Sequence, residues 1–278
     1  VLNPECGYVF NTNNTPFNAT CQEENLDPDK FDKTMGFQIG DNNRSLRFQY
    51  LINQYDKMSY EDFLQIKYDN GIMDSAYNSY IENIEVLFSM DPAKYPDIQD
   101  AIALLEDWDR KSDIENIPAS IAVFSIKYVV DHLFKSGVLP GSSTVEVDLF
   151  AEAIRAAKKH LLKYFGKLEV PLGDIQRHIR GDKSYPMAGA PDVLAAMHTD
   201  YYKDGILKTR HGESYIELVK FSDEGVEIES VNTFGASSKK DSPHYADQME
   251  LFVNQKTKKM TLDRETIFKE AKSIYHPK

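Results

Sequence analysis

The sequence predicts a protein of the α+β class, and the order of its segments leads to this prediction. Residues 1–55 are polar and turn-rich, and only Tyr8, Val9 and Phe10 make an apolar run of strand type, so we expect a strand and a long loop there. Residues 56–166 repeat apolar positions at helical spacing, and residues 167–278 return to strand-like runs before ending in helical pieces. Strands and helices that occupy separate parts of a chain are typical of α+β proteins.

The central region predicts helices with recognisable starts and stops. Ser59 and Asp62 form a capping box, and Pro118 suits a first helical turn because a proline there leaves no backbone N–H unpaired. Gly166 suits a helix end. We expect one helix to begin at Ser59 and a second to run from Asp74 to about Met90. Further helices are expected over 101–110, from Pro118 to Gly137 and over 147–165. Their apolar stripes predict a packed core.

The third region predicts a β-hairpin and then two helices. Residues 214–221 and 226–233 are apolar-rich runs, and 222–225 between them reads Ser-Asp-Glu-Gly, which is typical of a turn. We expect the helical pieces at about 244–254 and 263–275.

The bulk composition argues against two classes of partner. The formal net charge is −12, whereas binding to the phosphates of nucleic acid needs a basic face. No apolar run approaches the roughly 18 residues that a membrane-spanning helix needs. The chain begins with Val1 rather than Met, which we interpret as a processed chain, a trimmed one or a piece of a longer precursor.

The two cysteines, Cys6 and Cys21, leave two interpretations open. They are either free buried thiols or a disulfide that closes a loop around the opening polar stretch. A disulfide would place the protein outside the cytoplasm, because disulfides persist mainly in oxidising compartments.

Generic motifs indicate no metal or phosphate chemistry. No two of the 7 histidines are four residues apart, so a zinc site is not expected. The sequence has neither a glycine-rich phosphate loop nor a Gly-x-Ser-x-Gly elbow. The carboxylates of Glu23, Glu24, Asp27, Asp29 and Asp32 lack the spacing of an EF-hand, so we interpret them as a solvated acidic loop rather than as a calcium site.

Short motifs of another kind lie in order along most of the chain. They are Asn3-Pro4 to Gly7, Asn11 to Phe17, Arg44-Ser45-Leu46-Arg47, Leu105 to Asp109, Gly173 to Arg177, Gly189-Ala190-Pro191-Asp192, Gly212-Glu213-Ser214, Gly235 to Ser238 and Ser242 to Gln248. Each is short, but so many in one order are hard to explain by chance. Together they resemble the penicillin acylase family, especially its acyl-homoserine lactone acylase branch, and the last two resemble the family's C-terminal signature.

The resemblance implies a fold and a mechanism. Members of the family are N-terminal nucleophile hydrolases, so the implied fold is part of an αββα sandwich with a large helical insertion. The implied nucleophile is a serine exposed when the precursor cleaves itself, and its own α-amino group is the base. An α-amine has a pKa of about 8, close to the working pH, which suits this task. The serine attacks an amide carbonyl, and water then hydrolyses the acyl-enzyme.

The resemblance also implies two catalytic residues. Asn13 matches an asparagine whose side-chain amide donates to the oxyanion, and Arg44 matches an arginine near the nucleophile that would orient Asn13. From the residues alone, Asn13 is an ordinary turn asparagine and Arg44 an ordinary surface ion-pair residue. Arg47 competes with Arg44 for the arginine's role.

Three polar residues of the C-terminal motif are interpreted differently. We expect His244, Asp247 and Gln248 to form a structural network that joins the C-terminal helix to the sheet. A single histidine with a nearby acid is more often a satisfied packing group than a second catalytic centre.

The chain also departs from the family pattern, because Val1 cannot act as the nucleophile. The matched motifs belong to the C-terminal part of the catalytic β subunit, so we expect residues 1–278 to be the C-terminal portion of one acylase catalytic domain, inactive alone. The expected reaction is hydrolysis of an N-acyl amide bond in a penicillin, an acyl-homoserine lactone or a related compound. The expected partners are the N-terminal remainder of the precursor, which would hold the nucleophile, and this small substrate.

We expect a periplasmic or secreted bacterial protein that uses no cofactor, and we leave a calcium ion open for the full-length enzyme only. The alternative from another class is a non-catalytic extracytoplasmic α+β module that binds a partner or serves as a scaffold. A Gly-Ser or similar junction that opens a strand upstream would distinguish the two, because its absence would exclude the enzyme.

Overall fold

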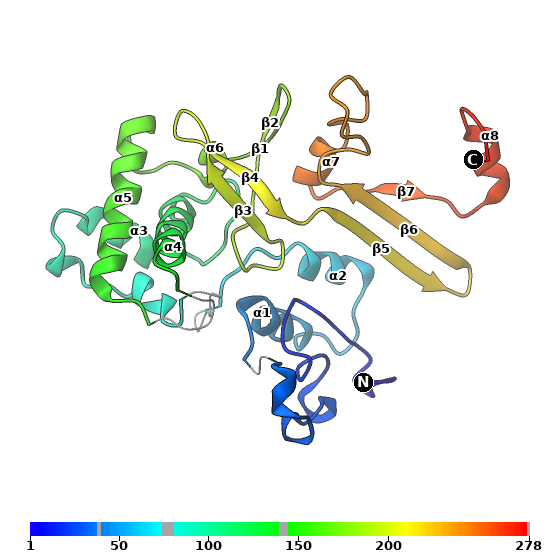
Figure 1. Cartoon of the computed structure of the whole chain (residues 1–278), viewed down its shortest axis with the longest axis horizontal. Helices are drawn as coiled ribbons and strands as arrows, with labels where there is room; N and C mark the ends of the chain where they lie inside the picture. Colours follow the sequence, from blue (N-terminus) through cyan, green and yellow to red (C-terminus); the bar gives the residue numbers. More distant parts are fainter. Residues whose placement is uncertain (38–39, 74–80, 139–143, 277–278) are drawn as a thin grey trace. The chain divides into compact units, whose positions relative to one another are not determined.

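The chain forms two compact units, which a computed structural model describes over residues 1–37, 40–73, 81–138 and 144–276 (Figure 1). The first unit comprises Val1–Arg177 and Pro186–Gly212, and the second comprises His178–Tyr185 and Glu213–Lys278. Both contain helices and strands, which confirms the predicted α+β class.

The first unit holds most of the helices. Its α-helices are α1 (Asn43–Ile52), α2 (Tyr60–Lys67), α3 (Gln99–Glu106), α4 (Pro118–Lys135), α5 (Val147–Phe165) and α6 (Leu172–Ile175). Its short 3-10 helices are η1 (Gln22–Glu24), η2 (Pro28–Lys30), η3 (Lys33–Met35), η4 (Ile84–Phe88) and η5 (Pro92–Lys94). The capping box at Ser59, the first-turn proline at Pro118 and the left-handed Gly166 after α5 are confirmed.

Helices α3, α4 and α5 lie side by side and supply the core of this unit (Figure 1). Ile121 of α4 and Phe150, Ile154 and Leu161 of α5 are all 0% exposed. Burying side chains of this size contributes roughly 1.5–3 kcal/mol each. The apolar stripes therefore serve packing, as their spacing predicts.

The helix expected from Asp74 to about Met90 is wrong over its described part, where only η4 forms. The side chain of Asn83, which lies just before η4, makes two hydrogen bonds with the backbone of Val145. Nδ2 of Asn83 donates to the carbonyl of Val145 at 2.9 Å, and the amide of Val145 donates to Oδ1 of Asn83 at 2.8 Å. This long-range pairing holds Asn83 outside helical geometry, so a longer helix cannot run through it. Asp74 itself lies outside the described residues.

The strand expected at Tyr8–Phe10 is also wrong. The amide of Phe10 donates to the carbonyl of Ala19 at 2.9 Å, but no strand is assigned there. The ring of Phe10 instead stacks on Phe48 of α1, with centroids 4.4 Å apart, and Tyr8 meets the same ring edge-on. The apolar run therefore packs against a helix rather than joining a sheet.

Strand pairing in the first unit leads to the loop that later forms part of the site. The first residues of β1 (Gln176–Arg180) pair in parallel with β4 (Leu207–Gly212), and β4 pairs antiparallel with β3 (Met197–Tyr201). The buried side chain of Gln176 donates from Nε2 to the carbonyls of Met187 and Gly189, at 2.9 and 2.7 Å. These two hydrogen bonds hold the beginning of the loop at residues 187–196, which precedes β3.

The second unit is built on the predicted hairpin. Strands β5 (Tyr215–Ser222) and β6 (Gly225–Asn232) pair antiparallel with Ser222 opposite Gly225, which confirms the turn. Strand β7 (Lys258–Met260) adds to β6, and β2 (Lys183–Pro186) neighbours β1. The C-terminal helices are α7 (Met249–Val253) and α8 (Arg264–Glu270), both shorter than expected.

The network expected at the C-terminal motif is confirmed for Gln248, which binds the sheet, whereas His244 and Asp247 form a local pair. Nδ1 of His244 donates to Asp247 at 2.8 Å, and the backbone amide of Asn232 in β6 donates to Oε1 of Gln248 at 2.8 Å. Gln248 is the residue immediately before α7, so it ties this helix to the sheet.

Among the described residues, no helix combines the length and apolarity needed to cross a membrane.

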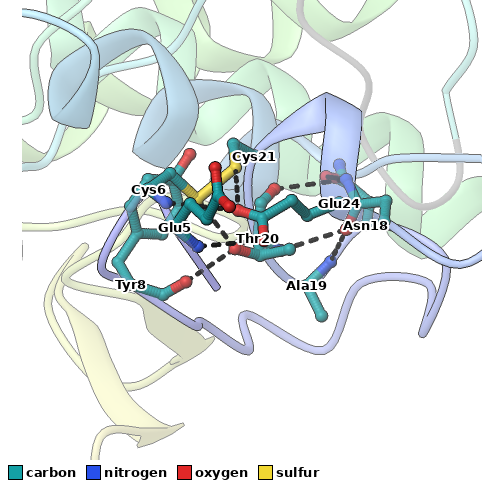
Figure 2. The surroundings of a disulfide bond; sticks show 9 residues. Glu5, Cys6, Tyr8, Asn18, Ala19, Thr20, Cys21 and Glu24 are labelled. Atoms are coloured by element: carbon teal, nitrogen blue, oxygen red, sulfur yellow. Dashed lines mark hydrogen bonds between the residues drawn. A yellow bond between two sulfur atoms is a disulfide. The ribbon is translucent and has the colours of Figure 1, made fainter. Parts of the chain in front are cut away.

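Cys6 and Cys21 form a disulfide, which decides between the two interpretations of the cysteines (Figure 2). Around it, Glu24 accepts hydrogen bonds from the backbone amides of Glu5 and Cys6 at 2.9 and 3.2 Å. The hydroxyl of Thr20 donates to the carbonyl of Tyr8 at 2.7 Å. The chain between the cysteines is therefore a closed, cross-braced loop.

Reduction of this disulfide should lower the free energy of unfolding by about 3 kcal/mol, because a bond that closes a loop of roughly 15 residues removes entropy from the unfolded chain. Denaturant unfolding with and without reductant measures the change. The double variant C6S/C21S is the control, since it should be less stable and insensitive to reductant. A wild-type midpoint unaffected by reduction would contradict the prediction.

Candidate active site

The turn at residues 11–14 uses its asparagines in different ways. Oδ1 of Asn11 accepts the backbone amide of Asn13 at 2.8 Å, and Oδ1 of Asn14 accepts the backbone amide and the hydroxyl of Thr12 at 2.7 and 3.0 Å. Nδ2 of Asn14 donates to the carbonyl of Asn18. Asn11 and Asn14 therefore build the turn, whereas the side chain of Asn13 takes no part in it.

Asn13 itself has a left-handed backbone, with φ of 59°. Asparagine adopts this region more readily than most residues. The residue is exposed, and its side-chain oxygen accepts a hydrogen bond from Nη1 of Arg44 at 2.9 Å. The side-chain nitrogen Nδ2 has no hydrogen-bond partner among the described residues.

The Arg44 contact fixes which way the amide of Asn13 faces. A guanidinium group can only donate hydrogen bonds, so the oxygen of the amide must face it. The Nδ2–H₂ group is therefore turned away from Arg44. The arrangement leaves a positioned N–H donor on an exposed loop.

Helix α1 presents Arg44 from its first turn. Asn42 precedes the helix and forms a reciprocal capping box with Ser45, with hydrogen bonds of 2.9 and 3.1 Å. Nδ2 of Asn42 also donates to the carbonyl of Thr12 at 3.0 Å, which joins the helix start to the turn that carries Asn13. The start of α1 is therefore hydrogen-bonded to the turn at residues 11–14.

Asp192 holds the other side of Arg44. Its Oδ1 accepts from Nε of Arg44 at 3.1 Å, and its Oδ2 accepts from the backbone amide of Asn43 at 3.2 Å. The side chain of Asp192 is only 8% exposed, against 23% for Arg44. Burial raises the pKa of the Asp192 carboxyl above its ordinary value, although the charge and hydrogen bond of Arg44 and the amide of Asn43 oppose the rise.

Arg47, the competing arginine, is engaged elsewhere. Its Nε and Nη2 donate to the two carboxylate oxygens of Asp69, both at 2.8 Å. Hydrogen bonding to Asp69 is the largest cause of a raised pKa of Arg47. The structure therefore places Arg44 rather than Arg47 against Asn13.

The acidic loop supplies hydrogen-bond acceptors to the backbone. Asp27 and Asp32 accept from the amides of Asp29 and Thr34 at 3.0 and 2.9 Å, at the starts of η2 and η3. Within the described residues, the group of potential metal ligands that comes close together is Cys6, Cys21 and Glu24, and its two sulfur atoms are bonded to each other.

The structure also brings together two histidines that the sequence spacing does not connect. His198 in β3 lies opposite His211 in β4, and their rings stack with centroids 4.3 Å apart. Burial lowers the pKa of His198 from its ordinary 6.5 to about 4, with further contributions from His211, Arg44 and Lys127. His198 is therefore neutral at physiological pH, and the electrostatic influence of Arg44 extends to it.

Asp192 and Asn43 are the parts of this site that sequence reasoning missed. Asp192 stands in the Gly-Ala-Pro-Asp motif that contributes to the family resemblance, so a signal was present, but nothing in the motif shows what its carboxylate contacts. Arg44 and Asp192 are 148 positions apart in the sequence, so their contact is not visible from the motif. Asn43 carried no signal of its own, although its Nδ2 donates to the carbonyl of Asp192 at 2.8 Å.

Comparison with solved structures identifies the class of protein to which this fold belongs. The structure is similar to that of a thermostable penicillin G acylase from Alcaligenes faecalis, with a TM-score of 0.51 and 16% sequence identity, over 99% of this chain and 58% of that one. The fold is therefore that of the penicillin acylases, which are N-terminal nucleophile hydrolases. The family model described as Penicillin amidase matches residues 1–269, so the chain belongs to the penicillin amidase family.

The relatives found by sequence comparison are named as acyl-homoserine lactone acylases. The acyl-homoserine lactone acylase PvdQ of Pseudomonas syringae pv. syringae (strain B728a) is 29% identical over an alignment of 167 positions, and the match covers 54% of this chain and 21% of the relative. The acyl-homoserine lactone acylase PvdQ of Pseudomonas savastanoi pv. phaseolicola (strain 1448A / Race 6) is 30% identical over an alignment of 135 positions, and the match covers 46% of this chain and 17% of the relative. The chain thus matches about a fifth of the length of these curated relatives.

The lowered pKa of His198 predicts a loss of stability in acid. Between about pH 6.5 and pH 4 the unfolded chain binds a proton at this residue and the folded chain does not, so folding becomes less favourable as the pH falls. His198→Gln should flatten the fall in unfolding free energy over this range, measured by urea titrations at successive pH values. His132→Gln, on an exposed position of α4, is the control. Parallel stability curves for His198→Gln and wild type would refute this.

Proposed function

We propose that this chain is the C-terminal part of an amide hydrolase in which Asn13 donates to the oxyanion and Arg44 orients Asn13. The observation that carries the proposal is the 2.9 Å hydrogen bond from Nη1 of Arg44 to Oδ1 of Asn13, found in a member of the penicillin amidase family. It is the contact that the resemblance leads one to expect between these two residues, and it leaves Nδ2 of Asn13 as the donor.

The chemistry asks for such a donor. When a serine oxygen attacks an amide carbon, negative charge develops on the carbonyl oxygen, and a hydrogen-bond donor already in place stabilises that charge without reorganising. The acyl group is then bound to the serine, the amine leaves with a proton, and water hydrolyses the ester. Asn13 would serve both addition steps, because each passes through an oxyanion.

We further propose that a segment preceding this chain in a self-cleaving precursor supplies the serine, and that the mature enzyme works in the periplasm or outside the cell. Two observations support this part of the proposal. The chain matches only about a fifth of its curated relatives, and its disulfide suits an oxidising compartment. The substrates proposed are penicillins, acyl-homoserine lactones or related N-acyl amides, after the names of the relatives.

The test uses the full-length protein and a panel of penicillin G and N-acyl-homoserine lactones, with release of the acyl chain as the readout. Asn13→Ala should lower kcat by about 10²–10³, the usual effect of removing one oxyanion donor. Asn53→Ala, at an exposed position after α1, should leave kcat unchanged. Full activity of Asn13→Ala would refute the oxyanion role. An inert wild-type protein would refute the enzyme and favour a binding or scaffold module.

A second comparison tests the choice of arginine. Arg44→Lys should lower kcat because lysine cannot bond Asp192 and Asn13 through one rigid plane. Arg47→Lys should lower stability, through its contacts with Asp69, and spare kcat. Steady-state kinetics and denaturant unfolding of both variants separate the two effects. The reverse pattern would assign the role to Arg47.

A further inference from the structure

We propose that Asp192 is a positioning residue, which acts through Arg44 to aim the side-chain amide of Asn13. This inference rests on the proposed function, because it gives Asp192 a part in the reaction assigned to Asn13. A chain of hydrogen bonds runs from Asp192, in the loop at residues 187–196, through Arg44 to Asn13.

The first step is the geometry of the guanidinium group. Asp192 accepts from Nε of Arg44 at 3.1 Å, and Asn13 accepts from Nη1 at 2.9 Å. Nε and Nη1 belong to one rigid plane, so holding the first fixes the direction of the second. Without Asp192, Arg44 could still reach Asn13, but with rotational freedom about its long side chain.

The second step is the fixed position of Asp192. Its Oδ2 accepts the backbone amide of Asn43, and its backbone carbonyl accepts Nδ2 of the same residue, at 3.2 and 2.8 Å. Oδ1 of Asn43 in turn accepts the backbone amide of Met73 at 2.9 Å. A carboxylate held to the start of α1 in this way moves with the helix that carries Arg44.

The third step is the loop around Asp192, which is fastened to other segments. The amide of Gly189 donates to the backbone carbonyl of Ser112 at 2.9 Å, and the amide of Ala195 donates to the backbone carbonyl of Asp69 at 2.9 Å. Gly189 has φ of 98°, and a Cβ added there would lie 2.5 Å from the carbonyl oxygen of Ala195. The loop is therefore closely packed on itself, and it gives Asp192 a defined location.

The charges also favour a role beyond packing. Arg44 lies in the first turn of α1, where the helix dipole is positive and a cation is unfavourable. The buried carboxylate of Asp192 offsets this charge and makes the placement of Arg44 tolerable. If Asp192 served only to cap the start of α1, its bond to the amide of Asn43 would be enough, and its contact with Arg44 would not be needed.

The chain offers a matched control in Arg47 and Asp69. This pair has the same two residue types, two hydrogen bonds of 2.8 Å and similar burial, with side chains 16% and 14% exposed. Among the described residues Arg47 makes its side-chain hydrogen bonds to Asp69, whereas the oxygen of Asn13 is bound by Arg44. Comparing variants of the two pairs therefore separates the effect of losing an ion pair from the effect of losing the orientation of Asn13.

The experiment is a double-mutant cycle in the full-length protein, on whichever of penicillin G and the N-acyl-homoserine lactones the wild type hydrolyses fastest. Asp192→Asn should lower kcat by about tenfold to a hundredfold, the scale expected for a misplaced group, with KM nearly unchanged. Asp192→Asn combined with Asn13→Ala should be no slower than Asn13→Ala alone, because both act through one donor. Losses that multiply in the double variant would overturn the proposal.

Asp69→Asn is carried through the same cycle as the control. It should lower stability, and any small loss of kcat should multiply with that of Asn13→Ala. If Asp192→Asn does not fold, Asp192→Glu, which keeps the charge but moves the carboxylate, takes its place in the cycle with the same expected outcomes.

A structural readout separates this inference from the proposed function. In crystal structures of the full-length protein, the bond from Nη1 of Arg44 to Asn13 should be lost in Asp192→Asn and kept in Asp69→Asn. An intact bond in Asp192→Asn overturns the inference whatever the activity. Full activity of Asn13→Ala overturns the proposed function, whereas a slow Asn13→Ala with a fully active Asp192→Asn overturns the inference alone.

Discussion

The contact between the buried carboxylate of Asp192 and the start of α1 is the constraint on which the site depends. It joins a loop before β3 to the helix that follows the N-terminal segment, across 148 positions of sequence. One carboxylate oxygen receives the guanidinium of Arg44 and the other a backbone amide that the helix itself leaves unpaired. Because the ion pair is largely buried, neither partner can be removed without leaving a charge in a poorly solvated place.

The turn that carries Asn13 shows how identical side chains take on different tasks. Asn11 and Asn14 direct their amides back to the turn's own backbone, the ordinary behaviour of asparagine in such loops. The side chain of Asn13 instead has a donor-only partner, Arg44, placed beside its oxygen. The composition of the stretch therefore cannot distinguish Asn13 from the other asparagines, because the distinction lies in Arg44, a neighbour from α1.

What the sequence predicts well here is local. The starts of α2 and α4 and the end of α5 follow from a capping box, a first-turn proline and a glycine, all read within a few residues. The errors occur where distant segments decide, as at Asn83, which pairs with Val145, and at Phe10, which packs on Phe48. The pairing of β1 with β4 and the position of Asp192 depend on such contacts too. Asn13 and Arg44 were reached through family resemblance, and their mutual contact needed the structure.

An exposed donor on a loop needs its order from elsewhere, since burial does not provide it. The disulfide closes the loop between Cys6 and Cys21, Asn42 binds the carbonyl of Thr12, and Arg44 binds the side chain of Asn13. The first restraint limits the conformations of the whole loop, the second fixes the turn, and the third fixes one amide plane. Each restraint acts on a smaller part of the chain than the one before. A donor ordered in this sequence of steps can be both accessible to a reacting carbonyl and already oriented, which are the two properties that electrostatic stabilisation of an oxyanion requires.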